Sequence, residues 1–326
     1  MRVQLDRPLT REDFTVGWIC ALDIELAAAL AVLDEKIPQP PFGKTEGDTN
    51  KYHFGRIKNR YIVVACLPAG CHGAATASVV AAYMMISFPA IRKHGFGLLV
   101  GVGGGVPTPG GHKGHDIRLG DVVVGMKVDN SPCIVPYDMG TAMEGGGFLP
   151  EAVLSTSPTI LLSVLSTIDS KNQTTFGKGL RDRARQIGEN DTRFQYPQSP
   201  DHLFQANYFH NAPHSSARTK MNNCNQCDLT KRVPRPAKTS DHPSIHYGPI
   251  ASGNLTMQDG VKRDMIAART GALCFEMEAA GLMNHFPCLV VRGISNYADG
   301  HRNKSWQPYA SLMAALYARE ILSTVH

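Results

Sequence analysis

The stretch FTVGWICALDIELAAALAVLDE, residues 14–35, decides the fold. From Phe14 to Ala21 it is a short apolar run rich in β-forming residues, and from Leu22 onward its apolar residues recur at helical spacing. This order predicts a strand that passes directly into a helix. The pattern returns at YIVVACL (61–67) before a helical stretch after Gly73, at GLLVGVGGG (97–105), at DVVVGM (121–126), and at PCLVVRGIS (287–295) before a helix over about 306–322.

These predicted strands are apolar along their whole length. Such strands are buried on both faces, as in a mixed or parallel sheet with helices on either side. We therefore predict a single-domain α/β fold over residues 14–324, a three-layer α/β/α sandwich with a central mixed, twisted sheet. Residues 171–244 show little periodicity and are rich in Asn, Gln, Pro, His and Arg, so we expect a long irregular insertion there.

Composition limits the classes of function. The chain has 326 residues, of which 43% are hydrophobic and 19% charged, and this excludes fibrous, collagen-like and wholly disordered proteins. A net charge of +5 favours a small anionic substrate and predicts no nucleic-acid partner. No apolar run approaches the roughly 18–20 residues that span a bilayer, and the first residues are charged. We therefore expect no membrane partner and a cytosolic or nuclear location, of which the cytoplasm is the preferred prediction.

Two segments imitate phosphate-binding loops without their spacing. In GVGGGVPTPGG (101–111) the third glycine is misplaced, and prolines stand where the helix of a dinucleotide-binding motif begins. Before Gly43-Lys44-Thr45, the position that a phosphate-loop motif requires to be glycine is Pro38. Neither a kinase nor a dehydrogenase is predicted, and we expect no cofactor. Gly103 and Gly104 do permit close backbone approach to a ligand at the carboxyl end of a strand, unless they only form a tight turn.

A cysteine pair lies inside the predicted insertion. Cys224-Asn-Gln-Cys227 has the spacing of half a zinc site, and His210 and His214 precede it. One such pair is equally compatible with a disulfide, a free dithiol or chance, so the sequence alone predicts no metal site. The other six cysteines lie in or near apolar segments and are interpreted as small buried hydrophobic residues.

Three segments together are more specific than any one of them: GWICALDIEL (17–26), GVGGGV with DIRLGDVVVG (101–125), and IASGN, CFEMEAAGLMN and VVRGISNYAD within 250–299. Through them the chain resembles the nucleoside phosphorylase and nucleosidase superfamily, over roughly residues 14–130 and 245–324. It is similar to methylthioadenosine/S-adenosylhomocysteine nucleosidases and, more closely, to fungal phosphorylase-like domains that begin NACHT, ankyrin or TPR receptor-like proteins. The resemblance implies a dimer or higher homo-oligomer.

The glutamates of EMEAAG suit cleavage of a ribosyl N-glycosidic bond. This cleavage passes through an oxocarbenium-like sugar, which needs a nearby carboxylate and a hold on the ribose hydroxyls. The resemblance implies that Glu278 accepts hydrogen bonds from the ribose diol and that Met277 packs against the sugar. Alternatively, Glu278 only begins a helix with a favourable charge. Glu276 shares a face with Glu278 if both lie on a strand, whereas a strand-to-helix turn would separate them.

Glu25 and Asn296 bear on the reaction type. Glu25 matches the water-activating glutamate of the nucleosidases, unless it is a solvated helix-face acid. Related phosphorylases bring an arginine from this early loop, and none lies between residues 12 and 41, so hydrolysis is favoured over phosphorolysis. Nucleosidases protonate the purine with the aspartate of a Ser-Asp pair, but here the pair is Ser295-Asn296. Asn296 either hydrogen-bonds the base, as in trimeric phosphorylases, or marks a weakened or substrate-trapping variant.

GHRNKSW (300–306) brings His301, Arg302 and Lys304 next to Trp306. The resemblance places Trp306 beside the 5′ substituent of ribose. Basic groups there suit a 5′-phosphate chain, unless the segment is only a solvated cationic loop.

Weaker substrate contacts are expected from Thr256 and Met257, and anion contacts from Arg118 and Lys113. The predicted reaction is hydrolysis of an adenine nucleotide or nucleoside, above all ATP or dATP, to adenine and ribose phosphate. The alternative functions are a phosphate-dependent purine nucleoside phosphorylase and a non-catalytic nucleotide sensor.

Overall fold

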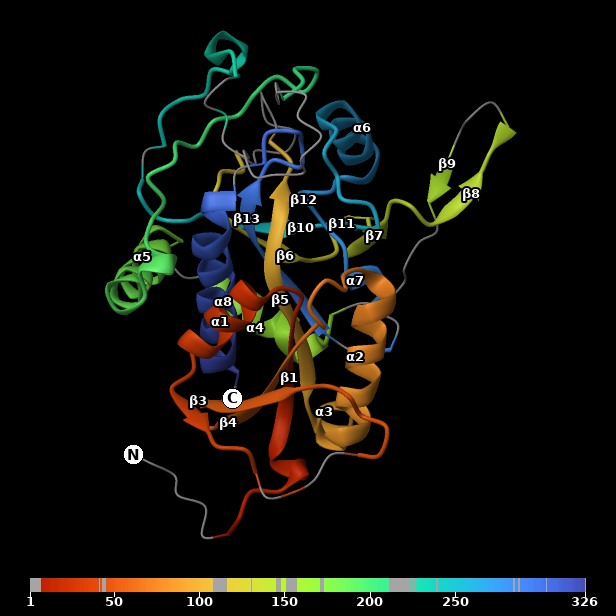
Figure 1. Ribbon diagram of the computed structural model, residues 1–326, viewed down its shortest axis with the longest axis vertical. Helices are drawn as coiled ribbons and strands as arrows, with labels where there is room; N and C mark the ends of the chain where they lie inside the picture. Colours follow the sequence, from red (N-terminus) through yellow and green to blue (C-terminus); the bar gives the residue numbers. More distant parts are fainter. Residues whose placement is uncertain are drawn as a thin grey trace.

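Eleven strands of the described chain form one mixed sheet through the centre of the molecule (Figure 1). They are β1 (Phe14–Cys20), β2 (Glu35–Ile37), β3 (Tyr52–Ile57), β4 (Arg60–Cys66), β5 (Phe96–Gly105), β6 (Val122–Gly125), β7 (Ile134–Pro136), β10 (Ile245–Gly248), β11 (Ile250–Ser252), β12 (Cys274–Glu276) and β13 (Cys288–Asn296). The main path runs β10-β6-β13-β5-β1-β4-β3-β2, and β12, β11 and β7 branch from β5. β1 is parallel to β4 and β5, and β5 is parallel to β13.

The structure is a computed structural model that describes residues 7–40, 42, 45–107, 116–129, 131–144, 148–150, 157–170, 173–210, 224, 227–238, 240–283, 285–286, 288–302 and 304–325. Lys113 and His214 lie outside these residues. Two further strands, β8 (Gly140–Ala142) and β9 (Phe148–Pro150), pair only with each other.

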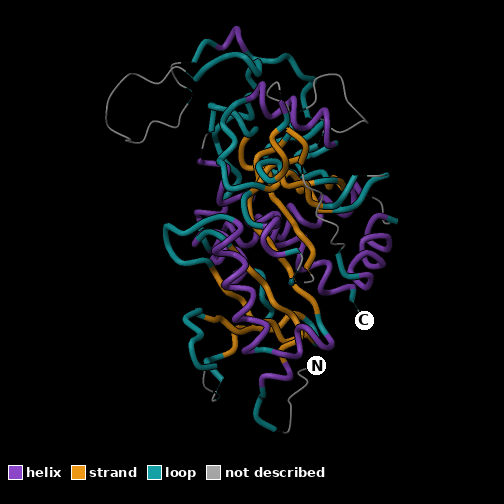
Figure 2. Tube along the Cα trace, turned by 90° about the vertical axis from the view of Figure 1, so that its right-hand side faces the viewer, coloured by secondary structure: helices purple, strands orange, loops and turns teal. Residues whose placement is uncertain are grey.

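Helices cover both faces of the sheet. They are α1 (Asp23–Ala31), α2 (Ala74–Ser87), α3 (Pro89–His94), α4 (Thr159–Asp169), α5 (Gln173–Asn190), α6 (Gly260–Thr270), α7 (Ala279–Leu282) and α8 (Gln307–Thr324). In Figure 1, α1 and α8 lie on one side of the sheet with α4 and α5 next to α8, whereas α2, α3 and α7 lie on the other. Figure 2 shows the strands in orange running between the purple helices. The predicted single-domain three-layer α/β/α fold is thereby confirmed.

The long apolar strands are buried as their sequences predict. Every described residue of β5 except Val102 is buried, and every residue of β13 except Asn296. Gly293 allows α8 to lie directly on β13, because a Cβ at this position would collide with the carbonyl oxygen of Ala310. This close packing fixes the end of β13, where Asn296 enters the next loop.

The region predicted to be an irregular insertion, 171–244, contains regular structure at its start. The 18-residue helix α5 spans Gln173–Asn190, which corrects the expectation of little periodicity. Leu180 and Ala184 are buried and Phe176 and Ile187 are partly buried, at spacings of three to four residues. Beyond α5, the described part of this region has two short 3-10 turns, at Thr192–Phe194 and Leu229–Lys231, and an isolated antiparallel bridge between Phe204 and Arg232. None of the helices in the described ranges is long and apolar enough to cross a membrane.

Candidate active site

A pocket of about 470 Å³ lies where β1, β5 and β13 end. Because these strands are parallel, their carboxyl ends meet at one edge of the sheet, the usual ligand position in open α/β sheets. Predicted site residues that line it are Glu25, Gly103, Gly104, Thr256, Met257, Glu276, Met277, Glu278, Asn296, Arg302 and Lys304. The remaining lining residues are Ala21, Leu22, His72, Val102, Tyr137, Leu255, Gln258, Phe275, Ala298, Gly300 and Gln307.

Glu25 is fixed by backbone amides at the turn from β1 into α1. Its Oε2 accepts hydrogen bonds from the N–H groups of Ala21 (2.8 Å) and Leu22 (3.0 Å), and its Oε1 accepts one from Val102 (2.8 Å). The side chain is buried, with 3% of the residue exposed. Burial raises the pKa of Glu25 above its usual value, although Arg292 and the three amides oppose the shift. Glu25 is therefore a rigid, buried pocket carboxyl and not a solvated helix-face acid.

Arg292 is the counter-ion of the site, and the sequence analysis did not single it out. It lies on β13 with 1% of its surface exposed. Its Nη2 forms a close ion pair with Glu276 and a longer one, 3.3 Å, with Glu278. A Cβ at Gly101 would collide with the Glu25 carboxylate and lie 2.6 Å from Nη1 of Arg292, so glycine is required where these two side chains meet. One guanidinium thus faces three buried carboxyl groups.

Glu276 and Glu278 have different environments. Glu276 ends β12, and its carboxylate accepts hydrogen bonds from the backbone N–H groups of Glu278 and Ala279 at the start of α7. Glu278 has no backbone partner this close: the N–H of Gly73 lies 3.4 Å from its Oε1. Burial raises the pKa of Glu278 to about 7; Arg292 opposes this, and the charges of Glu276 and Glu25 reinforce it. Glu276 therefore secures the strand-to-helix turn, which leaves Glu278 with acceptor capacity toward the pocket.

Asn296 is held at the end of β13 by its own side chain. Its Oδ1 accepts a hydrogen bond from the N–H of Ala298 (2.9 Å), and its Nδ2 donates one to the Ser295 hydroxyl (3.1 Å). Ser295 is buried and does not line the pocket, so it positions Asn296 instead of meeting a ligand. One N–H of the Asn296 amide remains available to a ligand.

Only part of the predicted basic cluster lies at the pocket. Arg302 and Lys304 line the pocket, and burial lowers the pKa of Arg302 against the opposing effect of Asp299. Trp306 does not line it, because its indole is buried against Tyr196 and Tyr309 and its N–H donates to the carbonyl of Ser199.

His301 and Arg118 also lie away from the pocket. The His301 ring is stacked on Phe204, with 4.3 Å between ring centroids. Arg118 forms an ion pair with Asp116 and donates to the carbonyl of Pro236. The sequence could not show these partners, because Phe204 and Pro236 come from the poorly periodic region.

An aromatic wall of the pocket was missed. Tyr137 and Phe275 line it and pack edge-to-face with ring centroids 5.4 Å apart. The hydroxyl of Tyr137 donates to the carbonyl of Leu255, which fixes the ring. Phe275 lies within the quoted segment CFEMEAAGLMN, so its position next to Glu276 was the available signal. Such a wall suits a flat, apolar-faced ligand such as a purine.

Comparison with known proteins assigns the family. The sequence profile of the Phosphorylase superfamily matches residues 15–317. The chain therefore belongs to the phosphorylase superfamily. It is also 35% identical over 319 residues to a nucleotide-binding leucine-rich repeat (NLR)-like protein of the fungus Hyaloscypha variabilis. That match covers 97% of this chain and 30% of the relative, so the chain spans less than a third of that protein's length. The predicted resemblance is confirmed.

Solved structures share the fold. The chain is similar to 5′-methylthioadenosine/S-adenosylhomocysteine nucleosidase of Helicobacter pylori, with 16% identity, a TM-score of 0.56, and 95% of this chain and 98% of that chain covered. Futalosine hydrolase of H. pylori is 16% identical to this chain with a TM-score of 0.56, and the match covers 96% of this chain and 99% of that chain. The corresponding nucleosidase of S. pneumoniae is 18% identical with a TM-score of 0.57, and the match covers 95% of this chain and 99% of that chain.

We predict that Arg292→Met lowers the free energy of unfolding by about 3–5 kcal/mol at pH 8, because it leaves three buried carboxyl groups without their guanidinium. Urea unfolding followed by circular dichroism measures this loss. Arg319→Met is the matched control, since the Arg319–Asp34 pair is partly exposed and contributes at most about 1 kcal/mol. Equal losses in the two variants would show that Arg292 has no special role.

We also predict a pH-dependent difference in stability between Glu278→Gln and the wild type. A folded-state pKa of about 7, above the usual 4.5, means that folding keeps the Glu278 proton. The stability from this group is present below about pH 4.5 and is lost as the pH rises through 7. The wild type should therefore lose on the order of 3 kcal/mol relative to Glu278→Gln between pH 4.5 and 8. Parallel unfolding curves across this range would contradict the assignment.

Proposed function

We propose that the chain is an N-glycosidase that hydrolyses the bond between ribose and the base of a purine nucleotide, with adenine nucleotides as the preferred class. One observation carries the proposal: the buried carboxyl groups Glu25 and Glu278 and the basic side chains Arg302 and Lys304 line one pocket. The carboxyl groups suit a sugar that becomes positively charged, and the basic groups suit phosphate.

The mechanism follows from the hydrogen bonds of the two acids. A carboxylate has about four acceptor positions, and three of those on Glu25 are taken by backbone N–H groups. The remaining position orients a water toward C1′ of ribose and receives its proton. Glu278 accepts hydrogen bonds from the ribose hydroxyls, and its charge stabilises the oxocarbenium-like transition state. The water oxygen bonds to C1′ as the C1′–N9 bond breaks. The electron pair of the C1′–N9 bond leaves with the base.

Asn296 and the aromatic wall recognise the base. Tyr137 and Phe275 offer an apolar surface to the purine. The free N–H of the Asn296 amide donates a hydrogen bond to a purine nitrogen, and solvent supplies the proton that the departing base takes up. The amide stabilises the leaving base less than a carboxylic acid would, because it cannot transfer a proton.

Hydrolysis fits this pocket better than phosphorolysis. A free phosphate next to C1′ would meet the Glu25 and Glu278 carboxylates, whereas phosphates attached to the substrate reach Arg302 and Lys304. Outside these two, no arginine or lysine is among the described lining residues.

We also propose a cytoplasmic homo-oligomer. All eight cysteines are described as free thiols, which suits a reducing compartment.

A non-catalytic nucleotide sensor is the second candidate, and Asn296 is the observation that favours it. Among the proteins of similar fold, an aspartate-to-asparagine variant of the H. pylori nucleosidase holds 5′-methylthioadenosine in its active site. The relative from Hyaloscypha variabilis is NLR-like, and a domain that binds a nucleotide without cleaving it would serve such a protein as a detector.

We predict that base release needs no added phosphate. Chromatography of ATP, adenosine and 5′-methylthioadenosine reactions, with and without phosphate, measures free adenine. Glu278→Ala should lose about 100-fold or more in rate, because it removes a group that stabilises the transition state. Turnover only with phosphate would establish a phosphorylase, and tight nucleotide binding without any base release would establish the sensor.

The phosphate contacts are tested in the same assay. Arg302→Ala and Lys304→Ala should raise KM for ATP about 10- to 100-fold, the value of a charge-assisted hydrogen bond, and leave KM for adenosine unchanged. Lys262→Ala, an exposed lysine outside the pocket, is the control. A similar change in KM for both substrates would remove the argument for a nucleotide.

We predict that Asn296→Asp raises the rate of base release by about 100-fold, because a carboxylic acid passes its proton to the purine as the bond breaks. The contacts with Ala298 and Ser295 accommodate the new carboxyl, since both can donate to it. The gain should decline above the pKa of the new acid. A variant no faster than the wild type would make the amide the native base-recognition group, as in the trimeric phosphorylases.

A further inference from the structure

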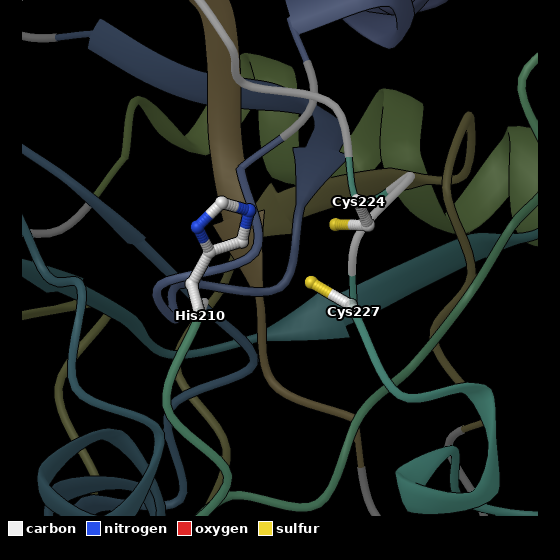
Figure 3. A group of neighbouring side chains, drawn as sticks. All are labelled: His210, Cys224 and Cys227. Carbon is white, nitrogen blue, oxygen red and sulfur yellow. The ribbon is translucent and has the colours of Figure 1, made fainter. Parts of the chain in front are cut away.

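A second group of side chains with defined chemistry lies outside the active-site pocket. His210, Cys224 and Cys227 point toward one another (Figure 3), and one ligand atom from each lies within 4.8 Å of the others. Cys227 is buried, and His210 and Cys224 are partly buried. None of the three lines the pocket or has a role in the proposed reaction.

The donor set selects the metal. Two thiols and an imidazole are soft to intermediate ligands, which favour Zn²⁺ over Mg²⁺ or Ca²⁺. Around a tetrahedral Zn²⁺, ligand atoms at 2.0–2.3 Å from the metal lie about 3.5–3.8 Å from one another. The side chains therefore need to close by only about 1 Å. The N–H of Cys227 donates to the carbonyl of Cys224 at 3.1 Å, a turn that brings the two side chains together.

The cluster also connects two parts of the chain. His210 lies in the predicted insertion, and its Cβ would be 3.3 Å from a Cβ at Gly300, a pocket residue. The His210 ring packs edge-on against His301, with 5.3 Å between centroids. The Nε2 of His301 is buried and has no hydrogen-bond partner among the described residues. His301 therefore adjoins the cluster through its contact with His210, whereas the ligand atoms that lie close together belong to His210, Cys224 and Cys227.

We propose that His210, Cys224 and Cys227 bind one structural Zn²⁺ per chain, and that this ion holds the insertion against the pocket segment 300–302. Binding converts both thiols to thiolates and releases their two protons to solvent. The ion takes no part in the glycosidase reaction, so its presence is independent of the proposed function.

The test is the metal content of the full chain, purified under reducing conditions without a polyhistidine tag. Mass spectrometry of metals should find about one zinc per chain. Cys227→Ser and His210→Ala should weaken zinc affinity by about 100-fold or more, since even outer residues of such sites affect it by 10- to 100-fold. Cys71→Ser, which changes an exposed thiol outside the cluster, should keep its zinc.

A chain that contains no zinc and takes up none when Zn²⁺ is added would overturn the proposal, as would a Cys224–Cys227 disulfide in the native protein. If a variant does not fold, Co²⁺ titration of the wild type decides: a thiolate-to-cobalt charge-transfer band is expected, and its absence contradicts the site.

A separate measurement tests whether the ion holds the insertion against residues 300–302. Removal of zinc by a chelator should increase hydrogen–deuterium exchange in peptides that contain residues 300–302, whatever the catalytic activity. Unchanged exchange in the zinc-free chain would show that the ion does not hold this segment.

Discussion

The structure depends on one buried guanidinium that faces three carboxyl groups. Arg292 comes from β13, Glu25 from the start of α1, and Glu276 and Glu278 from the end of β12 and the turn after it. A buried charge without a partner is strongly destabilising, so these elements must meet at the same edge of the sheet. Gly101 leaves the space in which the side chains converge.

This arrangement places more groups that can carry a negative charge than groups that carry a positive charge at the base of the pocket. Three carboxyl groups and one guanidinium cannot all be charged without an excess of negative charge, and the raised pKa of Glu278 shows where the excess is relieved. In the reaction that we propose, a sugar that becomes positively charged at C1′ restores the balance of charge. The excess of carboxyl groups that reduces the stability of the fold would, in the proposed reaction, stabilise the transition state.

The sequence predicted those elements whose own residues indicate whether they are buried or belong to the site. Strands apolar throughout, such as residues 97–105, gave the buried sheet, and EMEAAG located the acid pair. Arg292 stands within VVRGIS, and an arginine inside an apolar strand already indicates a buried ion pair. Trp306 was misplaced because its hydrogen bond to Ser199 and its ring contact with Tyr196 come from residues more than 100 positions away. Helix α5 was missed because charged residues separate its few apolar ones.

We propose that this pocket transfers the ribose of a purine nucleotide from the base to water. Nuclear magnetic resonance of ATP labelled with ¹³C at C1′ tests it directly, because the signal reports the atom bonded to C1′ in the product. We expect the N-glycoside signal to be replaced by the signals of a free hemiacetal, in buffer with or without phosphate. A C1′ signal coupled to phosphorus, or a nucleotide that stays intact when bound, would contradict it.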